Sequence, residues 1–147
     1  MSTPHAPPSL TIRSFQAPDR PALEALWARV FPDDPPRNAP SLMIEQKLKV
    51  QPDLLLVGLL GEALVGAVIT GFDGTRAWLY HLAVLPEWRR RGVASALVRA
   101  AEHGVRALGA SKLNLQVRAT NAEVVAFYRS LGYAIEERVS MGRLLDD

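Results

Sequence analysis

The sequence predicts one α/β domain, in which a mostly antiparallel sheet with one parallel strand pair carries about four helices. Two tight-turn signals, Gly61-Glu62 and Asp73-Gly74, separate three strand-length apolar segments. An amphipathic segment, residues 93–108, then leads to a further apolar strand, as in a crossover between parallel strands. With 147 residues, 48% of them hydrophobic, the chain can bury one core. We therefore assign residues 10–147 to a single domain and the proline-rich residues 1–9 to a flexible tail.

The first third of the chain predicts a strand followed by two helices. Leu10–Phe15 alternates apolar and polar residues, which suits a strand with one buried face. Asp19 is a candidate N-cap for a helix whose apolar residues recur at helical spacing up to Val30. The prolines of 32–40 end that helix in a loop, and Ser41 is expected to cap a second helix.

The middle of the chain predicts an antiparallel meander and then a crossover. The three strands of the meander are Leu54–Leu60, Ala63–Phe72 and Arg76–Leu85. The helix that follows, to about Leu108, has one apolar side that packs on the sheet, and Gly109 ends it. We therefore expect Leu113–Val117 to form a strand parallel to the one that ends at Leu85.

The C-terminal part predicts a last helix and a last strand. Thr120-Asn-Ala-Glu123 has the pattern of a capping box, and Gly132 suits the end of the helix that the box begins. Tyr133 to Leu144 is expected to form a closing strand or hairpin.

Composition argues against several classes of protein. The chain has no cysteine, so it has no disulfide framework, thiolate nucleophile or zinc–sulfur site, and a cytoplasmic location is the simplest expectation. No apolar run approaches the roughly 18–20 residues that span a bilayer, and the first residues do not resemble a signal peptide. A formal charge of +2 with interspersed signs does not indicate nucleic-acid binding. His5 and His103 are too isolated to indicate a metal site.

The segment between the third strand of the meander and the amphipathic helix combines features of an anion-binding site. Arg89, Arg90 and Arg91 precede a helix start, where unpaired N–H groups and the helix dipole favour an anion. Gly92 and Ala94 have almost no side chain, so a phosphate group can approach the backbone closely. For the three arginines alone a solvated basic turn or a nucleic-acid patch is the alternative. Their combination with the small residues and the preceding apolar strand favours a phosphate site.

This segment, Arg89-x-x-Gly92-x-Ala94, resembles the acyl-CoA-binding motif of the GNAT superfamily of N-acetyltransferases. A second block resembles the family's following strand, helix and terminal strand: Leu113–Arg118, Asn121 and Phe127-Tyr128-x-x-x-Gly132-Tyr133. Together the two blocks cover residues 79–133. The chain is most similar to small single-domain bacterial members, and the run Leu-Gln-Val-Arg-Ala-Thr-Asn, residues 115–121, resembles the ribosomal-protein alanine acetyltransferases.

The resemblance implies a GNAT-like fold with a splayed parallel strand pair, acetyl-CoA as cosubstrate and no metal. The backbone of the first splayed strand would pair with the pantetheine arm, and an N–H near Val84 could polarise the acetyl carbonyl. The start of the following helix would hold the pyrophosphate. The residues implied in cofactor binding are Leu82, Ala83, Val84, Arg89, Arg90, Arg91, Gly92, Val93, Ala94, Ser95, Asn121 and Tyr128.

Tyr128 matches the motif position from which, in many members of the family, a tyrosine protonates the leaving thiolate of CoA. A phenol of pKa about 10 can donate to a thiolate whose acid has a pKa of about 8.5. Tyr128 also lies on the apolar stripe of its helix, so a core aromatic is the alternative. For Asn121, a contact with pantetheine and a simple role at the helix start both stay open.

No motif carries the general base. Ribosomal-protein alanine acetyltransferases have a glutamate where this chain has Gln116, and glutamine cannot accept the proton. Tyr80 and His81 are the nearby candidates, acting through water, although strand alternation predicts that they lie on opposite faces. A structural histidine is the alternative for His81. In the family a loop arches over the acceptor site, and acidic residues of the matching region could also reach it: Asp33, Asp34 and Glu45.

We therefore predict an N-acetyltransferase that moves acetyl directly from acetyl-CoA to the amine of a small molecule or a peptide N-terminus. Its partners would be these two substrates, without nucleic acid or membrane, and a homodimer is compatible with them. The alternative is a non-catalytic acyl-CoA-binding or regulatory module, which the missing glutamate favours. Nucleic-acid binding is weaker, because no aromatic platform or recognition helix accompanies the arginines. The acidic pair Asp33 and Asp34 mildly favours a cationic amine as acceptor.

Overall fold

The computed structural model describes residues 9–146, so the predicted tail, residues 1–9, lies outside the described residues except for Ser9. By its internal contacts the chain divides into two compact units, residues 1–116 and 117–147, which are described separately below. None of the helices in the described part combines the length and apolar character that crossing a membrane would require.

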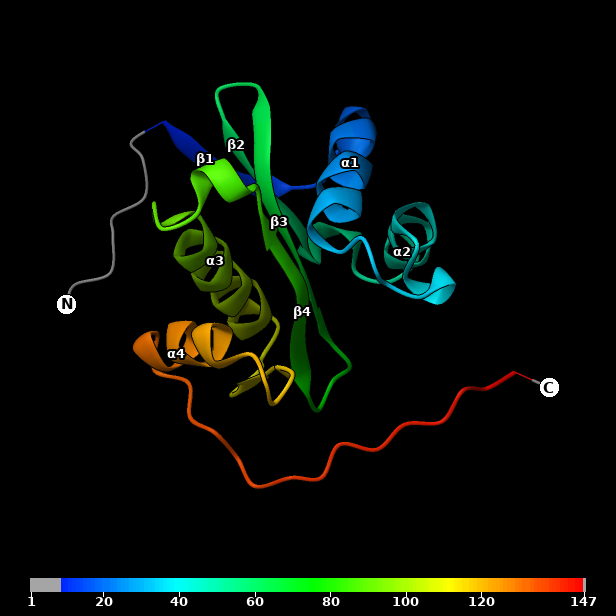
Figure 1. Cartoon of the computed structure of the whole chain (residues 1–147), viewed down its shortest axis with the longest axis vertical. Helices are drawn as coiled ribbons and strands as arrows, with labels where there is room; N and C mark the ends of the chain where they lie inside the picture. Colours follow the sequence, from blue (N-terminus) through cyan, green and yellow to red (C-terminus); the bar gives the residue numbers. More distant parts are fainter. Residues whose placement is uncertain (1–8, 147) are drawn as a thin grey trace. The chain divides into compact units, whose positions relative to one another are not determined.

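The first unit contains a five-stranded sheet in the order β1-β2-β3-β4-β5 (Figure 1). Its strands are β1 (Leu10–Ser14), β2 (Leu55–Leu60), β3 (Ala63–Phe72), β4 (Ala77–Val84) and β5 (Leu113–Asn114). The first four strands pair antiparallel and β4 pairs parallel with β5, which confirms the predicted fold class. The predicted strand at 113–117 is shorter than expected, because its pairing with β4 covers only two residue pairs, Ala77 with Leu113 and Trp78 with Asn114. Beyond Trp78 the edge of β4 that faces away from β3 is therefore not paired with β5.

Helices of the first unit cover both faces of this sheet (Figure 1). They are α1 (Arg20–Val30) and α2 (Pro40–Lys47) on one face and α3 (Val93–Ala107) on the other. Strands β2 and β3 are almost continuously aliphatic because both of their faces are buried, rather than one buried and one exposed. The core on the α1/α2 face is built from Leu23, Leu26, Trp27, Ile44, Leu55, Val57, Leu59, Ala67, Ile69 and Ala83.

Gly66 allows α3 to approach the sheet closely. A Cβ at this position would lie 3.0 Å from a side-chain carbon of Leu97, 3.2 Å from one of Val93 and 3.1 Å from the carbonyl oxygen of Ala83. Contacts this short are rarely tolerated, so the absence of a side chain seats the first turns of α3 directly on β3. The start of α3 is thereby fixed next to the end of β4.

The start of α1 is joined to β1 by a charge pair. Asp19 is the N-cap residue, as predicted, but its carboxylate accepts from the backbone N–H of Gln16 at 2.8 Å and from Arg13 at 2.7 and 3.0 Å. Arg13 and these hydrogen bonds hold the pKa of Asp19 below its usual value.

The predicted cap of α2 is wrong, because the helix begins one residue before Ser41, at Pro40, with Ala39 as N-cap. Proline suits a first helical position, where its fixed φ is correct and its missing N–H has no partner to lose. Single 3₁₀ turns also occur at Ala17–Asp19, Pro36–Asn38, Pro52–Leu54 and Pro86–Trp88.

The second unit contains one helix, α4 (Ala122–Ser130), among its described residues. Its N-cap is Asn121, whose side-chain oxygen accepts from the N–H of Val124 at 3.3 Å, so the capping box expected from Thr120 is wrong. Gly132, with φ +97°, ends the helix as predicted.

Residues 133–146 form neither helix nor strand, so the predicted closing strand or hairpin is wrong. Apolar alternation produces a strand only where the backbone N–H and C=O groups find a neighbouring strand. The described residues of the second unit contain no other strand that could supply these partners.

Candidate active site

An irregularity in β4 sets the geometry of the candidate site. Ala67 of β3 pairs with Ala83 of β4, and Ile69 pairs with Tyr80. One β3 residue, Val68, therefore faces two β4 residues, His81 and Leu82. This is a β-bulge, and His81 occupies its left-handed position with φ +58°. A non-glycine residue in this conformation is uncommon and points to a local constraint.

The bulge interrupts the alternation of side chains between the two faces of β4. The prediction that Tyr80 and His81 lie on opposite faces depended on this alternation. Tyr80 lines a cavity together with residues of α2, and His81 packs against two rings of the α1 region. Both side chains therefore lie on the α1/α2 face, and the expectation that they occupy opposite faces is wrong. A bulge inserts one residue into the strand, so the side chains on either side of it lose the period of two.

His81 is enclosed by aromatic rings and one carboxylate. Its ring lies 5.2 Å from that of Trp27 and 4.4 Å from that of Phe31, and its Nε2 is 3.2 Å from Oδ2 of Asp34. Burial lowers the pKa of His81, while the charge of Asp34 opposes this effect. The imidazole is therefore kept neutral near pH 7, and its position beside Asp34 resembles an oriented general base.

Two buried polar atoms beside His81 have no hydrogen-bond partner among residues 9–146: Nε1 of Trp27 and Oδ2 of Asp34. Buried polar groups are normally hydrogen-bonded, so these two atoms are available to a water molecule or a ligand. Asp34 therefore acts on His81 through its charge, at 3.2 Å from Nε2, and not through a hydrogen bond. Of the acidic residues considered in the sequence, Asp34 is the one that reaches His81, whereas the exposed Glu45 pairs with Arg20.

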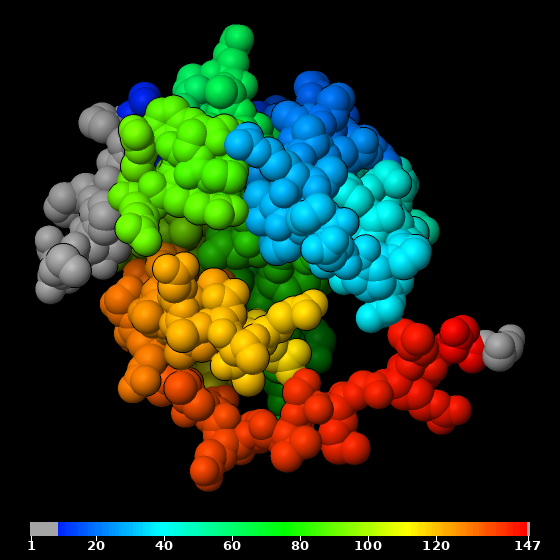
Figure 2. Space-filling view, in the orientation of Figure 1, coloured from blue at the N-terminus to red at the C-terminus, as the bar shows by residue number. Residues whose placement is uncertain are grey.

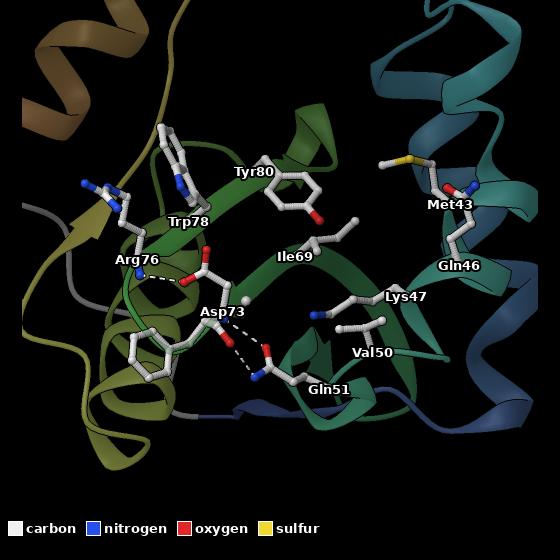
Figure 3. A pocket seen from close by; sticks show the side chains of 12 residues that line it. Met43, Gln46, Lys47, Val50, Gln51, Ile69, Asp73, Arg76, Trp78 and Tyr80 are labelled. Atoms are coloured by element: carbon white, nitrogen blue, oxygen red, sulfur yellow. Dashed lines mark hydrogen bonds between the residues drawn. The ribbon is translucent and has the colours of Figure 1, made fainter. Parts of the chain in front are cut away.

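A cavity of about 470 Å³ opens beside Tyr80, between β3, β4 and the end of α2 (Figure 3). Its walls are mainly apolar and aromatic, from Met43, Val50, Ile69, Phe72, Trp78 and Tyr80. Its polar residues are Gln46, Lys47, Gln51, Asp73 and Arg76. Burial raises the pKa of Tyr80 above its usual value, so this phenol is a donor rather than a base at neutral pH.

The start of α3 has the features of an anion site that the sequence predicts. Gly92 is its N-cap with φ +82°, and the first hydrogen bond to Gly92 comes from the N–H of Ala96 at 3.1 Å. The N–H groups of Val93, Ala94 and Ser95 consequently have no partner inside the helix. Together with the helix dipole they favour a bound anion.

The three arginines before α3 have different roles in the structure. Arg89 donates from Nε to the carbonyl of Val84 at 3.2 Å, which ties the loop to the end of β4. The guanidinium of Arg91 lies 5.0 Å from the ring centre of Trp88. Arg90 adopts a positive φ of 63°, so the loop turns sharply before Gly92.

The loop before α3 is also fastened to the end of α1. Arg29 donates two hydrogen bonds, of 3.0 and 2.9 Å, to the carboxylate of Glu87. Figure 2 shows these two segments, in blue and light green, side by side on the surface. The α1 end that carries Phe31 and the loop before α3 are thus held against each other.

The backbone of Val84 is directed to the open edge of β4. Leu85 donates to the carbonyl of Val65 on β3, and neighbouring residues of a strand point their N–H and C=O groups in opposite directions. Val84 therefore presents its backbone away from β3, where β5 no longer pairs. Its carbonyl is already engaged by Arg89, so its N–H is the group available to a ligand.

Two further predicted site residues, Asn121 and Tyr128, lie in the second unit. Asn121 acts as the helix cap described above. Tyr128 is buried, and its ring packs edge-on against Phe127 and Tyr133, at 5.1 and 5.6 Å between ring centres. Burial raises its pKa to about 12, and its hydroxyl has no hydrogen-bond partner among the described residues. Tyr128 is therefore protonated near neutral pH and can act as a donor.

Lys47 is a site residue that the sequence analysis missed. It lies three positions after the buried Ile44 in α2 and is itself only 7% exposed, with its side chain in the wall of the cavity. The signal that could have found it is this spacing, since residues three apart share one face of a helix. No group of three or more His, Asp or Glu side chains within residues 9–146 could hold a metal ion.

Comparison with known proteins gives one consistent family. A sequence model of the acetyltransferase (GNAT) family matches residues 20–133. An acetyltransferase of Pectobacterium atrosepticum is 38% identical over 139 residues, which are 94% of this chain and 98% of that protein.

Solved structures agree with this match. The ribosomal-protein-S18-alanine N-acetyltransferase of Escherichia coli has a TM-score of 0.68 and 26% identity, over 84% of this chain and 76% of its own. The aminoglycoside acetyltransferase AAC(6')-Iy, in complex with the bisubstrate analogue CoA-S-monomethyl-acetylneamine, has the same fold, with a TM-score of 0.79. It shares 20% identity over 92% of this chain and 97% of its own.

The pairing of His81 with Asp34 predicts a change in a measurable pKa. Replacing Asp34 by Asn removes the negative charge that favours the imidazolium, so the pKa of His81 should fall further below its ordinary value. An NMR titration of the imidazole resonances measures this shift. Asp33→Asn, at the exposed neighbouring carboxylate, is the control and should leave the titration unchanged. An unchanged titration in the Asp34 variant would show that the two side chains do not interact.

Proposed function

The chain belongs to the acetyltransferase (GNAT) family, and from this premise we propose that it transfers acetyl from acetyl-CoA directly to the amine of a small molecule or a peptide. The observation that carries the proposal is the anion-binding start of α3, directly after the open edge of β4. The family match, residues 20–133, includes parts of both compact units. This supports one catalytic domain over residues 10–147.

The cosubstrate fits the residues at this edge. The pyrophosphate would be bound by the N–H groups of 93–95 and by the charge of the preceding arginines. The pantetheine arm would lie along Leu82–Val84, on the side of β4 that β5 leaves unpaired. CoA complexes of proteins with this fold support the assignment. In this family-based proposal Asn121 contributes a further contact to pantetheine.

Acetyl transfer requires an uncharged amine, a polarised thioester and a proton for the leaving thiolate. His81, neutral and held between Trp27 and Phe31 beside Asp34, is the proposed base that takes the proton of the amine through a bridging water. The N–H of Val84 would donate to the thioester oxygen as negative charge develops there. Tyr128 would return a proton to the CoA thiolate, so that free CoA and the acetylated amine leave.

The assignment of His81 accounts for the glutamine at position 116. Gln116 cannot act as a base, and Tyr80 has a raised pKa, which makes it a poor proton acceptor at neutral pH. Tyr80 is instead proposed to orient the acceptor or the bridging water from the cavity wall. The base then comes from the bulge of β4 and its partner Asp34.

Release of free thiol from acetyl-CoA in the presence of an amine panel tests the function directly. The panel should contain small amines, amino acids and peptides with free N-termini. Thiol release that depends on an amine supports the transferase. CoA binding without release with any acceptor would instead support a non-catalytic acyl-CoA-binding module.

Replacing Gly92 by Val should weaken binding of CoA by at least about tenfold. A β-branched residue is strained at φ +82° and would project toward the bound pyrophosphate. Calorimetric titration with CoA measures the loss. Gly74→Val is the matched control, because Gly74 has φ +103° in a hairpin turn with nothing within 4 Å of an added Cβ. Equal CoA affinity in both variants would contradict the phosphate site.

Tyr128→Phe should lower kcat by about 10²–10⁴-fold and leave the affinity for CoA unchanged. Phenylalanine keeps the ring packing, so the variant isolates the hydroxyl. Steady-state thiol release and CoA titration give the two quantities. Tyr133→Phe removes a hydroxyl from the ring that packs on Tyr128 and serves as control. A kcat equal to that of the parent would show that the hydroxyl of Tyr128 takes no part in catalysis and that its role is structural.

A further inference from the structure

Lys47 is a buried cation without a partner. Its side chain is 7% exposed, and it forms no hydrogen bond or ion pair with any of residues 9–146. Burial lowers its pKa, and Asp53 opposes this only through its more distant charge. Its ammonium faces the cavity without an anionic partner at hydrogen-bond distance, so a ligand that supplies an anion would pair with it.

The surrounding polar groups do not neutralise Lys47. The side chain of Gln51 is bound to the backbone of Phe72. Its amide nitrogen donates to the carbonyl of Phe72 at 2.7 Å, and its oxygen accepts from the N–H of Phe72 at 2.9 Å. One oxygen of Asp73 accepts from Thr75, through both its N–H and its hydroxyl, and from the N–H of Arg76. These groups stabilise the β3–β4 turn and the neighbouring loop.

The ammonium points into the cavity beside Tyr80. Figure 3 shows Lys47 and the hydroxyl of Tyr80 directed into the same space, whereas the guanidinium of Arg76 points away from it. Gly71 also lines this cavity next to Lys47, because a Cβ there would lie 3.6 Å from Nζ, at ordinary contact distance. The remaining wall is apolar, so a ligand here combines an apolar body with one anionic group.

We propose that the amine acceptor carries a carboxylate that pairs with Lys47, so that the substrates are amino acids, or short peptides, with an apolar side chain. The proposal rests on the acetyltransferase function given above. A single ammonium suits a monoanion, and Asp73 at the cavity wall disfavours a doubly charged phosphate. A carboxylate bound at the α2 end of the cavity would direct the amine toward Tyr80 and the bulge of β4.

Acceptors that differ only in this group test the proposal. L-phenylalanine, L-methionine and L-leucine are compared with their carboxamides and with the matching aminophosphonates. The parent enzyme should have a lower KM for the carboxylates than for the carboxamides, by about tenfold or more, as expected for a charge-assisted hydrogen bond. A preference for the phosphonates would identify a phosphate-bearing acceptor and overturn the carboxylate assignment.

Lys47→Met keeps the length of the side chain and removes the charge. It should raise KM for the carboxylates about 10–100-fold, with little change in kcat, and leave KM for the carboxamides unchanged. Lys47→Arg should retain the preference for carboxylates. Lys49→Met, at an exposed lysine two residues away, is the control and should behave as the parent. Equal effects of Lys47→Met on both acceptor series would overturn the proposal.

A binding experiment separates this proposal from the transferase function. If no amine supports thiol release, the acetyltransferase proposal fails, but titration with N-acetyl-L-phenylalanine still probes the cavity. Binding to the parent and loss of binding in Lys47→Met would support the carboxylate site. Absence of binding to the parent would overturn it, and thermal unfolding of both proteins verifies that the variant is folded.

Discussion

The candidate site depends on the extra residue in β4. By placing His81 in a left-handed conformation, the bulge turns both Tyr80 and His81 toward α1 and α2 and offsets the strand relative to β3. A non-glycine residue held this way costs on the order of 1–2 kcal/mol, which the packing of the imidazole between Trp27 and Phe31 offsets. The ring contacts thus hold the strained backbone, and the strained backbone positions the proposed base.

The elements that the sequence predicted well are those whose signal is local. Turn residues located the meander, and the apolar stripe and Gly109 located α3, because these patterns depend on backbone conformation and one buried face. The bulge had no such signal, since its left-handed residue is a histidine rather than a glycine. The strand predicted over Tyr133–Leu144 is absent for a different reason. Its apolar alternation is a local signal, but a strand also needs a neighbouring strand to pair with.

The same distinction between local signals and tertiary packing applies to the candidate site. The glycine N-cap of α3 and the arginines before it adjoin in sequence, so the features of the proposed anion site could be recognised there. The pair of His81 with Asp34 could not, since it depends on how α1 and β4 pack together. For Lys47 the spacing from Ile44 indicates only the shared helix face, and the enclosing cavity depends on the packing of α2. A lysine at the end of a short helix ordinarily belongs to a solvated face, and only the packing of α2 on the sheet encloses it.

The pKa shifts of His81 and Tyr128, each considered within its own unit, agree with the role proposed for each residue. Burial lowers the pKa of the histidine and raises that of the tyrosine to about 12, so at neutral pH one can accept a proton and the other can donate one. A carboxylate on the acceptor would raise the pKa of its amine, and pairing it with Lys47 would reduce that effect. His81, the proposed base, would then receive its proton from a less basic amine.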